Sequence, residues 1–513
     1  MAGMYRNFFS VGAFTALSRL TGFLREIAIG ALMGQTALAD AYFVALRLPN
    51  QFRAIFGEGA FNSAYVPTYS RVLVTAGDES ATLFASRILT LLTLSQLALL
   101  ALAYWQMPAL VQIIAPGFDN DPAKFALAVG MTRITFPYLA FITIATLHTA
   151  TLNAHGYFVA GALAPVLLNA FIIGFLSAAF LFPNAGVAAS WGVALSGVAQ
   201  LALLVAEAFR RGVLEHFAWP RLDRDVRQFF RALGPAVIGS AGQQIAILAD
   251  TILASGMPTG SVASINYADR LYQLPLGVIG VAAGTVLLPE MTKRLAAADP
   301  NGAARAQNRS IALSLAMCAP FLVGFLMIPE EMIRGAYMRG AFDGAAALRS
   351  SHVLAAYGFG LIPMVLIRSA VAAFQSRGDT TTPMMCFFAG LAANVALKLA
   401  LSGMLGPMGL AVGTAVGAWI NFGLLVFLAR RRGFSEPDDR LFENIALMLF
   451  SAAGAAFATP TCLAASAGLA AHLPFLHNEF LVAATFTALS LVYLALYAGG
   501  SLLFGRGMRR QLS

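Results

Sequence analysis

The chain has 513 residues, of which 59% are hydrophobic and only 11% are charged, and its formal net charge is +9. A soluble protein carries about 25% charged residues, so this composition excludes a soluble globular protein and predicts a polytopic membrane protein. The three cysteines, Cys318, Cys386 and Cys462, lie in apolar runs. Their number and spacing exclude a disulfide framework and a metal site, and predict small core residues.

The apolar segments predict an all-α fold. A helix needs about 20 apolar residues to cross a bilayer, and the sequence offers fourteen such candidates. They fall at 7–33, 38–70, 88–114, 125–152, 158–182, 187–209, 229–254, 262–292, 309–329, 350–376, 382–403, 408–429, 441–470 and 480–504. Because Arg19 and Arg25 interrupt the first segment, it does not resemble a cleavable signal and is expected to stay in the mature protein.

The basic residues predict the orientation. If the N-terminus is cytoplasmic, 21 of the 33 Lys and Arg residues fall in cytoplasmic loops, four in loops on the other side and eight within segments. Positive charge gathers in cytoplasmic loops, so both termini are predicted in the cytoplasm. The same rule accounts for the basic loops without a nucleic-acid partner, and no RNA-binding aromatic pattern accompanies them.

An internal repeat divides the chain. Its offset spans six predicted helices, an even number, so two lobes share one membrane orientation about a parallel pseudo-twofold axis. We predict an N-lobe at 1–212 with helices one to six, a C-lobe at 213–433 with helices seven to twelve, and two extra helices at 434–513. The landmarks recur at a nearly constant offset: Pro67 and Pro289, Gly156 and Gly378, Gly192 and Gly413, Leu48 and Leu274.

Ionisable residues inside the first two segments are the main functional signal. Each costs about 2.5–3.5 kcal/mol at the bilayer centre, so such residues face protein or a water-filled cavity. Several arginines together predict a cavity for an anion, since the guanidinium fork suits phosphate. The alternative is a set of structural ion pairs. The residues are Arg19, Arg25, Glu26, Asp40, Arg47, Arg53 and Glu58, with Arg270 in the second lobe.

Helix geometry adds local expectations. Arg19 and Arg25 are six residues apart, about 240° around a helix, so a bend at residues 21–22 is needed to bring both into one cavity. Glu26 is expected to pair with Arg19 across two turns. Asp40 and Arg47 are seven residues apart and are expected to share a helix face.

The second lobe supplies fewer basic groups. Asp269 and Arg270 are followed by Gln273 and Pro275, which predicts an interrupted helix there. The acid Asp250 is a further intramembrane charge.

Three other polar positions carry weaker hypotheses. Lys398 is a candidate to neutralise Asp250, in a role that a bound cation could otherwise play. His148 and His155 are expected to pack or to be solvated rather than to carry protons.

Several motifs resemble those of the MurJ (MviN) lipid II flippases, within the multidrug/oligosaccharidyl-lipid/polysaccharide exporter superfamily. The resemblance reaches across the twelve repeat helices, and its first hairpin is the most specific part. The motifs are SRLTGFLRE at 18–26, ADAYFVALRLPN at 39–50, FRAIFGEGAFNSAYVP at 52–67, LNAHGYF to APVLLN at 152–169, YADRLYQLPLGVIGVAAGTVLLP at 267–289 and GDTTTP at 378–383.

This resemblance implies a flippase of the bacterial inner membrane. It would move undecaprenyl-pyrophosphate-linked peptidoglycan precursor, lipid II, from the cytoplasmic to the periplasmic leaflet by alternating access. A central cationic cavity would hold the headgroup, and the last two helices would form a groove for the lipid tail. The other partners implied are membrane lipids and cell-wall synthesis proteins, and the chain is expected to be a monomer.

The resemblance also assigns roles to residues. Arg19, Arg25, Arg53 and Arg270 would bind the pyrophosphate. Two departures stand out: Gln273 replaces an acid found in some relatives, and Lys398 stands where some relatives place an acid for sodium. Sodium binding is therefore not expected at Lys398. The cavity or gating charges would be Glu26, Asp40, Arg47, Glu58 and Asp269.

The energy source stays open between the membrane potential and coupling to sodium or protons. No ATP-binding motif occurs, no cofactor is expected, and no catalytic constellation suggests an enzyme. Three alternatives remain at this point: a flippase for another polyprenyl-linked glycan such as an O-antigen or capsule unit, a cation-coupled drug antiporter, and a lipid-binding scaffold that moves nothing.

Overall fold

The computed structural model describes residues 2–54, 60–471 and 477–503, and Glu58 lies outside them. The described residues form helices joined by short loops and contain no strand. Ten helical segments among them are long and apolar enough to cross a membrane. The predicted all-α membrane fold is confirmed, whereas the count of fourteen spans stays a prediction. The chain divides into two compact units, Met1–Ala263 and Ser264–Ser513.

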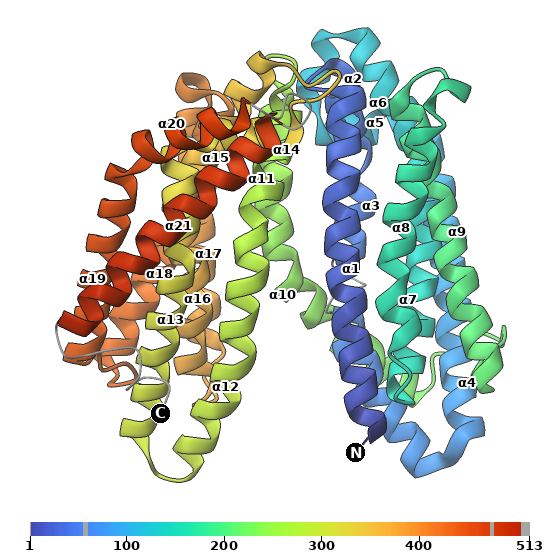
Figure 1. Cartoon of the computed structure of the whole chain (residues 1–513). Coiled ribbons are helices and arrows are strands. Elements are labelled where there is room, and N and C mark those ends of the chain that lie inside the picture. Colours follow the sequence, from blue (N-terminus) through green and yellow to red (C-terminus); the bar gives the residue numbers. More distant parts are fainter. Residues whose placement is uncertain (1, 55–59, 472–476, 504–513) are drawn as a thin grey trace. The chain divides into compact units, whose positions relative to one another are not determined.

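In the first unit, α1 lies beside α8, α8 beside α9, and α4 beside α7 (Figure 1). The helices are α1 (Ala2–Met33), α2 (Ala37–Ala45), α3 (Arg47–Phe52), α4 (Phe61–Trp105), α5 (Met107–Ile114), η2 (Pro116–Asn120), α6 (Pro122–Thr135), α7 (Tyr138–Ala154), α8 (Val159–Ser177), η3 (Ala179–Leu181), α9 (Ala185–Arg211) and α10 (Arg224–Ser255).

Several helix boundaries differ from the predicted spans. The predicted span 38–70 is divided between α2, α3 and α4, and α4 continues to Trp105, so it also takes in most of the predicted span 88–114. Gly77 breaks α4 with a φ of 82°, a left-handed conformation that glycine adopts without a Cβ clash. Pro137, which lacks a backbone N–H, separates α6 from α7.

In the second unit, α17 packs along α18, and α19 and α21 lie beside each other and beside α13 (Figure 1). The π-helix η4 follows Pro275 and confirms the predicted interruption. The helices are α11 (Ser261–Pro275), η4 (Leu276–Gly280), α12 (Val281–Ala296), α13 (Pro300–Met327), α14 (Pro329–Tyr337), α15 (Gly344–Phe359), α16 (Leu361–Gln375), α17 (Thr381–Leu405), α18 (Pro407–Arg431), α19 (Asp439–Phe457), α20 (Thr459–Ala470) and α21 (His477–Leu503).

The internal repeat is visible in the helix starts. Four helices of the first unit precede four helices of the second unit by one and the same spacing. Helices α5, α6, α8 and α9 begin at Met107, Pro122, Val159 and Ala185, and helices α14, α15, α17 and α18 begin at Pro329, Gly344, Thr381 and Pro407. The landmarks Gly156 and Gly378 are separated by the same spacing.

The two copies also share a helix cap. Gly156 follows the end of α7 with a φ of 82°, and Gly378 follows the end of α16 with a φ of 80°. The next N–H in each copy bonds back into the helix, from Tyr157 to the Leu152 carbonyl and from Asp379 to that of Phe374. Both copies therefore use the same glycine-ended cap.

Helix α10 is grouped with the first unit because it packs against α4. The Phe229 ring on α10 contacts the rings of Phe61, Tyr65 and Phe84 on α4. The compact units consequently divide after residue 263, and the predicted lobe boundary after residue 212 stays a prediction.

Candidate functional site

Arg25 on α1 packs against α8, and its side chain is only 13% exposed. Its Nη1 donates to Asn169 Oδ1 at 2.9 Å, and its Nη2 donates to Glu26, whose side chain is buried. The Asn169 amide donates in turn to the Ser18 carbonyl at 3.0 Å and to the Thr21 hydroxyl at 3.1 Å. Asn169 therefore ties α1 to α8 and orients the guanidinium. Sequence reasoning missed Asn169 because it lies 144 residues from Arg25.

The side chains of Arg19 and Arg25 lie on different sides of α1. Helix α1 continues through residues 21–22 without an interruption, so Arg19 is exposed while Arg25 is largely covered. The expected pairing of Glu26 with Arg19 is wrong, since Glu26 bonds to Arg25. The physical reason is that the two arginines lie on different sides of one continuous helix, so only Arg25 faces α8 with Glu26 beside it.

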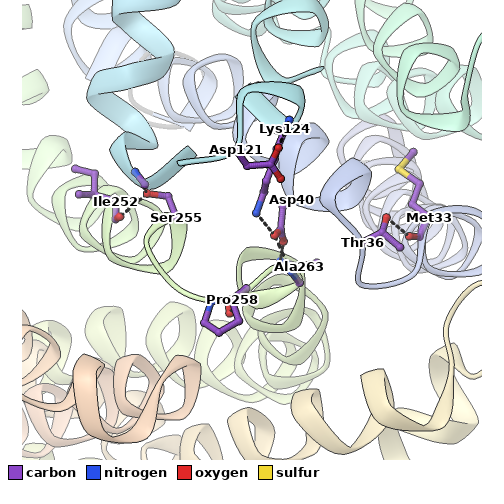
Figure 2. Close-up of polar contacts among 12 residues, drawn as sticks. Met33, Thr36, Asp40, Asp121, Lys124, Ile252, Ser255, Pro258 and Ala263 are labelled. Atoms are coloured by element: carbon purple, nitrogen blue, oxygen red, sulfur yellow. Dashed lines mark hydrogen bonds and ion pairs between the residues drawn. The ribbon is translucent and has the colours of Figure 1, made fainter. Parts of the chain in front are cut away.

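Asp40 on α2 is fully buried and accepts three hydrogen bonds (Figure 2). Lys124 Nζ on α6 donates to its Oδ2 at 2.7 Å. The backbone N–H of Gly260 donates to Oδ2 at 2.7 Å, and that of Ala263 donates to Oδ1 at 2.9 Å. Because these N–H groups belong to the start of α11, Asp40 caps that helix from a distant segment.

The surroundings of Asp40 differ from those expected. The sequence places Lys124 in a loop, whereas its side chain is buried, with Nζ 4.2 Å from the centre of the Phe118 ring. Helix α2 ends at Ala45 and α3 begins at Arg47, so Asp40 and Arg47 lie on successive helices, and their sharing of one face stays a prediction. Both carboxylate oxygens of Asp40 already accept hydrogen bonds. The structural role of Asp40 is therefore to connect α2 with α6 and with the start of α11.

Arg53 lines a cavity of about 180 Å³ inside the first unit. This is smaller than the roughly 300–1,000 Å³ of typical ligand pockets, so it can receive only part of a large ligand. Tyr138 on α7 lines the same cavity. The walls are otherwise mainly apolar and come from α7, α8 and α9: Ile142, Ala145, Thr146, Thr149, Gly161, Ala164, Pro165, Leu168, Gln200 and Leu204.

In the second unit, Asp269 and Arg270 are half-buried on α11, and Asp269 accepts a hydrogen bond from Gln273. The Tyr337 hydroxyl on α14 donates to the Tyr267 carbonyl at 3.3 Å. This contact holds α11 just before the charged pair. The residue that replaces an acid in some relatives, Gln273, is thus a direct partner of Asp269.

Lys398 is fully buried between α17 and α18. A Cβ placed on Gly413 would lie 2.7 Å from Lys398 Cγ, so the glycine makes room for the lysine stem. Asp250 is half-buried on α10 in the other unit, and its pairing with Lys398 stays a prediction. Among the residues that the structure describes, no cluster of three or more His, Cys, Asp and Glu side chains could hold a metal ion.

A second buried polar group lies at the end of α7. His148 Nδ1 is 2.7 Å from Glu215 Oε2, and the Thr151 hydroxyl donates to the other carboxylate oxygen. The Tyr65 hydroxyl on α4 lies 2.8 Å from that of Thr151. The expectation that His148 only packs or is solvated missed this partner, because Glu215 lies 67 residues away in a loop.

The comparisons with known proteins agree over most of the chain. The family model described as "Lipid II flippase MurJ" matches residues 29–491. The chain belongs to the MurJ family. The match begins after Arg19, Arg25 and Glu26, so those three residues lie outside it. A MurJ-family chain with many apolar helices is a multi-pass protein of the inner membrane.

Individual MurJ proteins are similar to this chain along most of its length. The "Probable lipid II flippase MurJ" of Rhizobium meliloti (strain 1021) is 39% identical over 456 residues, covering 88% of this chain and 85% of the relative. The protein of the same description from Rickettsia prowazekii (strain Madrid E) is 30% identical, covering 88% and 87%.

Solved structures support the MurJ fold. The structure titled "Lipid II flippase MurJ, inward closed conformation" matches with a TM-score of 0.81 at 24% identity, covering 97% of this chain and 98% of that one. An inward-facing multidrug transporter of the MATE family matches with a TM-score of 0.69 at 14% identity, covering 83% and 97%. The same helical architecture therefore occurs in MurJ and in MATE transporters.

Proposed function

We propose that this chain is a flippase that moves lipid II from the cytoplasmic to the periplasmic leaflet of the bacterial inner membrane. The observation that carries the proposal is the MurJ family match over residues 29–491. The relatives that are named lipid II flippases at 30–39% identity support the substrate. The arginines of the first unit are consistent with a pyrophosphate headgroup.

In this proposal Arg25, Arg53 and Arg270 contact the pyrophosphate, and Arg19, which lies on another side of α1, reaches it only in a different conformation. A guanidinium has five N–H donors in a planar fork, and Arg25 uses one on Asn169 and one on Glu26. Glu26 keeps the Arg25 charge neutralised before substrate binds. An arriving phosphate would take over that role.

The remaining site residues act on the conformational change. Asp40, Arg47, Glu58 and Asp269 are the gating or cavity charges of two lobes that alternate in access. The last two membrane helices, built from α19–α20 and α21, hold the lipid tail. The cavity beside Arg53 receives a part of the headgroup.

The remaining features of the proposal concern energy and assembly. The chain is a transporter without enzymatic activity and needs no cofactor, nucleic acid or metal. It acts as a monomer with both termini in the cytoplasm, among membrane lipids and cell-wall synthesis proteins. The membrane potential acts on the positive charges of the cavity as the lobes move, and moving one charge across the membrane is worth about 2.3 kcal/mol per 100 mV.

Depletion of the chain in cells tests the function. Outer-leaflet lipid II is measured after depletion and after rescue with wild type, Arg25→Ala or Arg211→Ala. Arg211 is the control because it is exposed and pairs with Glu207. We expect wild type and Arg211→Ala to restore outer-leaflet lipid II. With Arg25→Ala we expect about tenfold less outer-leaflet lipid II, because a hydrogen bond to a charged group contributes about 1.5–3 kcal/mol. Normal outer-leaflet lipid II in depleted cells that lack another flippase would contradict the proposal.

The energy source has a separate test. Collapse of the membrane potential by an ionophore should slow lipid II translocation in cells that contain wild type. Unchanged flux without a potential would refute this part of the proposal and leave the substrate assignment standing.

A further inference from the structure

Residues 212–223 join α9 to α10 without regular secondary structure, and we call them the joining segment. Two of its backbone N–H groups bond to α4: that of His216 to Ser86 Oγ at 3.0 Å and that of Ala218 to Thr90 Oγ1 at 3.1 Å. Ser86 and Thr90 are one helical turn apart, about 6 Å along the axis. Alternate residues of an extended chain have a similar spacing of about 6.6 Å, so the segment runs along α4.

The far end of the joining segment is held by ion pairs near the start of α10. Asp223 caps α10 by accepting from the Val226 N–H at 2.8 Å, and it pairs with Arg87. Arg71 pairs with Asp225 at 2.7 Å. The two cations that α4 presents to this region are therefore engaged with carboxylates of the segment's end and of α10.

Glu215 is the buried centre of the joining segment. Its side chain and that of His148 are 1% and 3% exposed. One carboxylate oxygen faces His148 Nδ1 and the other accepts from the Thr151 hydroxyl. A buried carboxylate needs a compensating positive charge. Among the described residues, His148 is the cation-forming side chain that bonds to Glu215.

The other titratable groups around Glu215 do not replace His148. Tyr65 on α4 reaches Glu215 through the Thr151 hydroxyl, and neither Tyr65 nor Tyr69 can carry a positive charge. His155 at the end of α7 bonds to the Tyr69 hydroxyl at 2.9 Å. Arg211 at the end of α9 bonds to Glu207 on its own helix at 2.8 Å. The neighbour of Glu215 in sequence, His216, is exposed.

We propose that His148 and Glu215 form a proton-binding site that holds the joining segment against α4 and α7. With one proton shared by the pair, the imidazolium and the carboxylate compensate each other. Without it, a negative charge stays buried beside an uncharged imidazole. Buried chains of His and carboxylates in membrane proteins serve as proton sites for this reason.

The sign of the pH effect follows from the proton count. Above neutral pH the bound pair still shares one proton, whereas the released state, with a solvated imidazole and a solvated carboxylate, holds none. The free energy of release therefore falls as pH rises. The segment is held at neutral pH and is released increasingly at alkaline pH. The inference concerns the segment that leads into α10 and does not depend on lipid II being the substrate.

Hydrogen exchange of the full-length chain in detergent tests the proposal. The readout is the protection of the His216 and Ala218 amides between about pH 6 and pH 9, corrected for the intrinsic pH dependence of exchange. We expect wild-type protection to fall by up to about tenfold per pH unit on the alkaline side, the limit for one proton. Protection that stays constant across this range would overturn the proposal without the need for any variant.

Two variants and one control sharpen the result. His148→Gln should expose the segment at every pH, and Glu215→Gln should keep it held at every pH, so both lose the pH dependence. His155→Gln removes a neighbouring histidine that does not contact Glu215, and should keep the wild-type profile. Retention of the wild-type profile in Glu215→Gln, or its loss only in His155→Gln, would contradict the assignment.

Discussion

The two repeats end in the same turn but differ in the chemistry that follows it. Gly212 after α9 has a φ of 70°, and Gly433 after α18 has a φ of 64°. In the first copy Glu215 comes three residues later and is buried, whereas its counterpart Glu436 is exposed. The backbone of the repeat is therefore kept while the environment of the carboxylate is not.

The partners of the carboxylate explain the difference. At the spacing of the helix starts, the positions equivalent to His148 and Thr151 are Ala370 and Ala373, which cannot bond to a carboxylate. The second loop is also shorter, because α19 is already capped by Asp438. The two copies thus share the arrangement of their helices. They differ in the buried polar partners, which are present around the carboxylate in the first copy and replaced by alanines in the second.

The largest expected effect breaks the connection at Asp40, whose equivalent at the spacing of the helix starts is Val262, a side chain that accepts no hydrogen bond. Asp40→Asn removes the partner of the buried Lys124 ammonium and should destabilise the chain by about 3–5 kcal/mol. Thermal unfolding of the purified chain measures the loss. The control Asp438→Asn changes a helix cap in the second unit and should cost about 1 kcal/mol or less. Equal losses in the two variants would contradict the role assigned to Asp40.

The next effect compares the two carboxylates directly. Glu215→Ala removes hydrogen bonds between a buried charged group and two partners, and should cost about 2–3 kcal/mol. Glu436→Ala changes an exposed side chain and should stay within about 0.5 kcal/mol. The same unfolding measurement applies to both. A loss at Glu436 as large as that at Glu215 would remove the distinction between the repeats.

Replacing the cap glycine by alanine should lower the stability of the chain equally in the two copies. Gly156→Ala and Gly378→Ala each place a Cβ at a left-handed position, and neither Cβ meets a heavy atom within 4 Å. Backbone strain alone should then cost about 1–2 kcal/mol in each copy. Unfolding midpoints of the two variants check this, and a clear difference between them would mean that the caps are not equivalent.

The smallest effect concerns acid pH at the second cap. The N–H and then the hydroxyl of Thr382, followed by Arg432, hold the pKa of the Asp379 carboxyl below its ordinary value. A lowered folded-state pKa contributes stability above the unfolded value, and this contribution is lost as pH falls through the folded-state pKa. Asp379→Asn should flatten the dependence of the unfolding midpoint on pH below about pH 4. An unchanged slope would contradict it.

Much of the fold was predictable because it depends on local patterns. Hydropathy indicated an all-helical membrane chain, and glycine and proline landmarks indicated a repeat that the equal spacing of the helix starts confirms. Pro275 correctly marked the interrupted helix. Helix breaks at Gly77 and Pro137 were missed, because apolar composition continues across them and does not report backbone direction.

The site was less predictable because its contacts join distant segments. The arginines and Asp40 stand out as charges in apolar runs, but their partners do not. Asn169 and Lys124 come from other helices, and Lys124 resembles an ordinary loop residue. Which neighbour Glu26 chooses depends on how α1 packs against α8, and helix periodicity alone suggested the wrong arginine.

Translocation by the purified chain decides whether it is a lipid II flippase. The chain is reconstituted into liposomes, and movement of fluorescent lipid II between leaflets is compared with that of an undecaprenyl-pyrophosphate-linked O-antigen unit. We predict that lipid II crosses faster than in protein-free liposomes and faster than the other glycan. Lipid II movement no faster than in protein-free liposomes, or equal rates for the two glycans, would contradict this function.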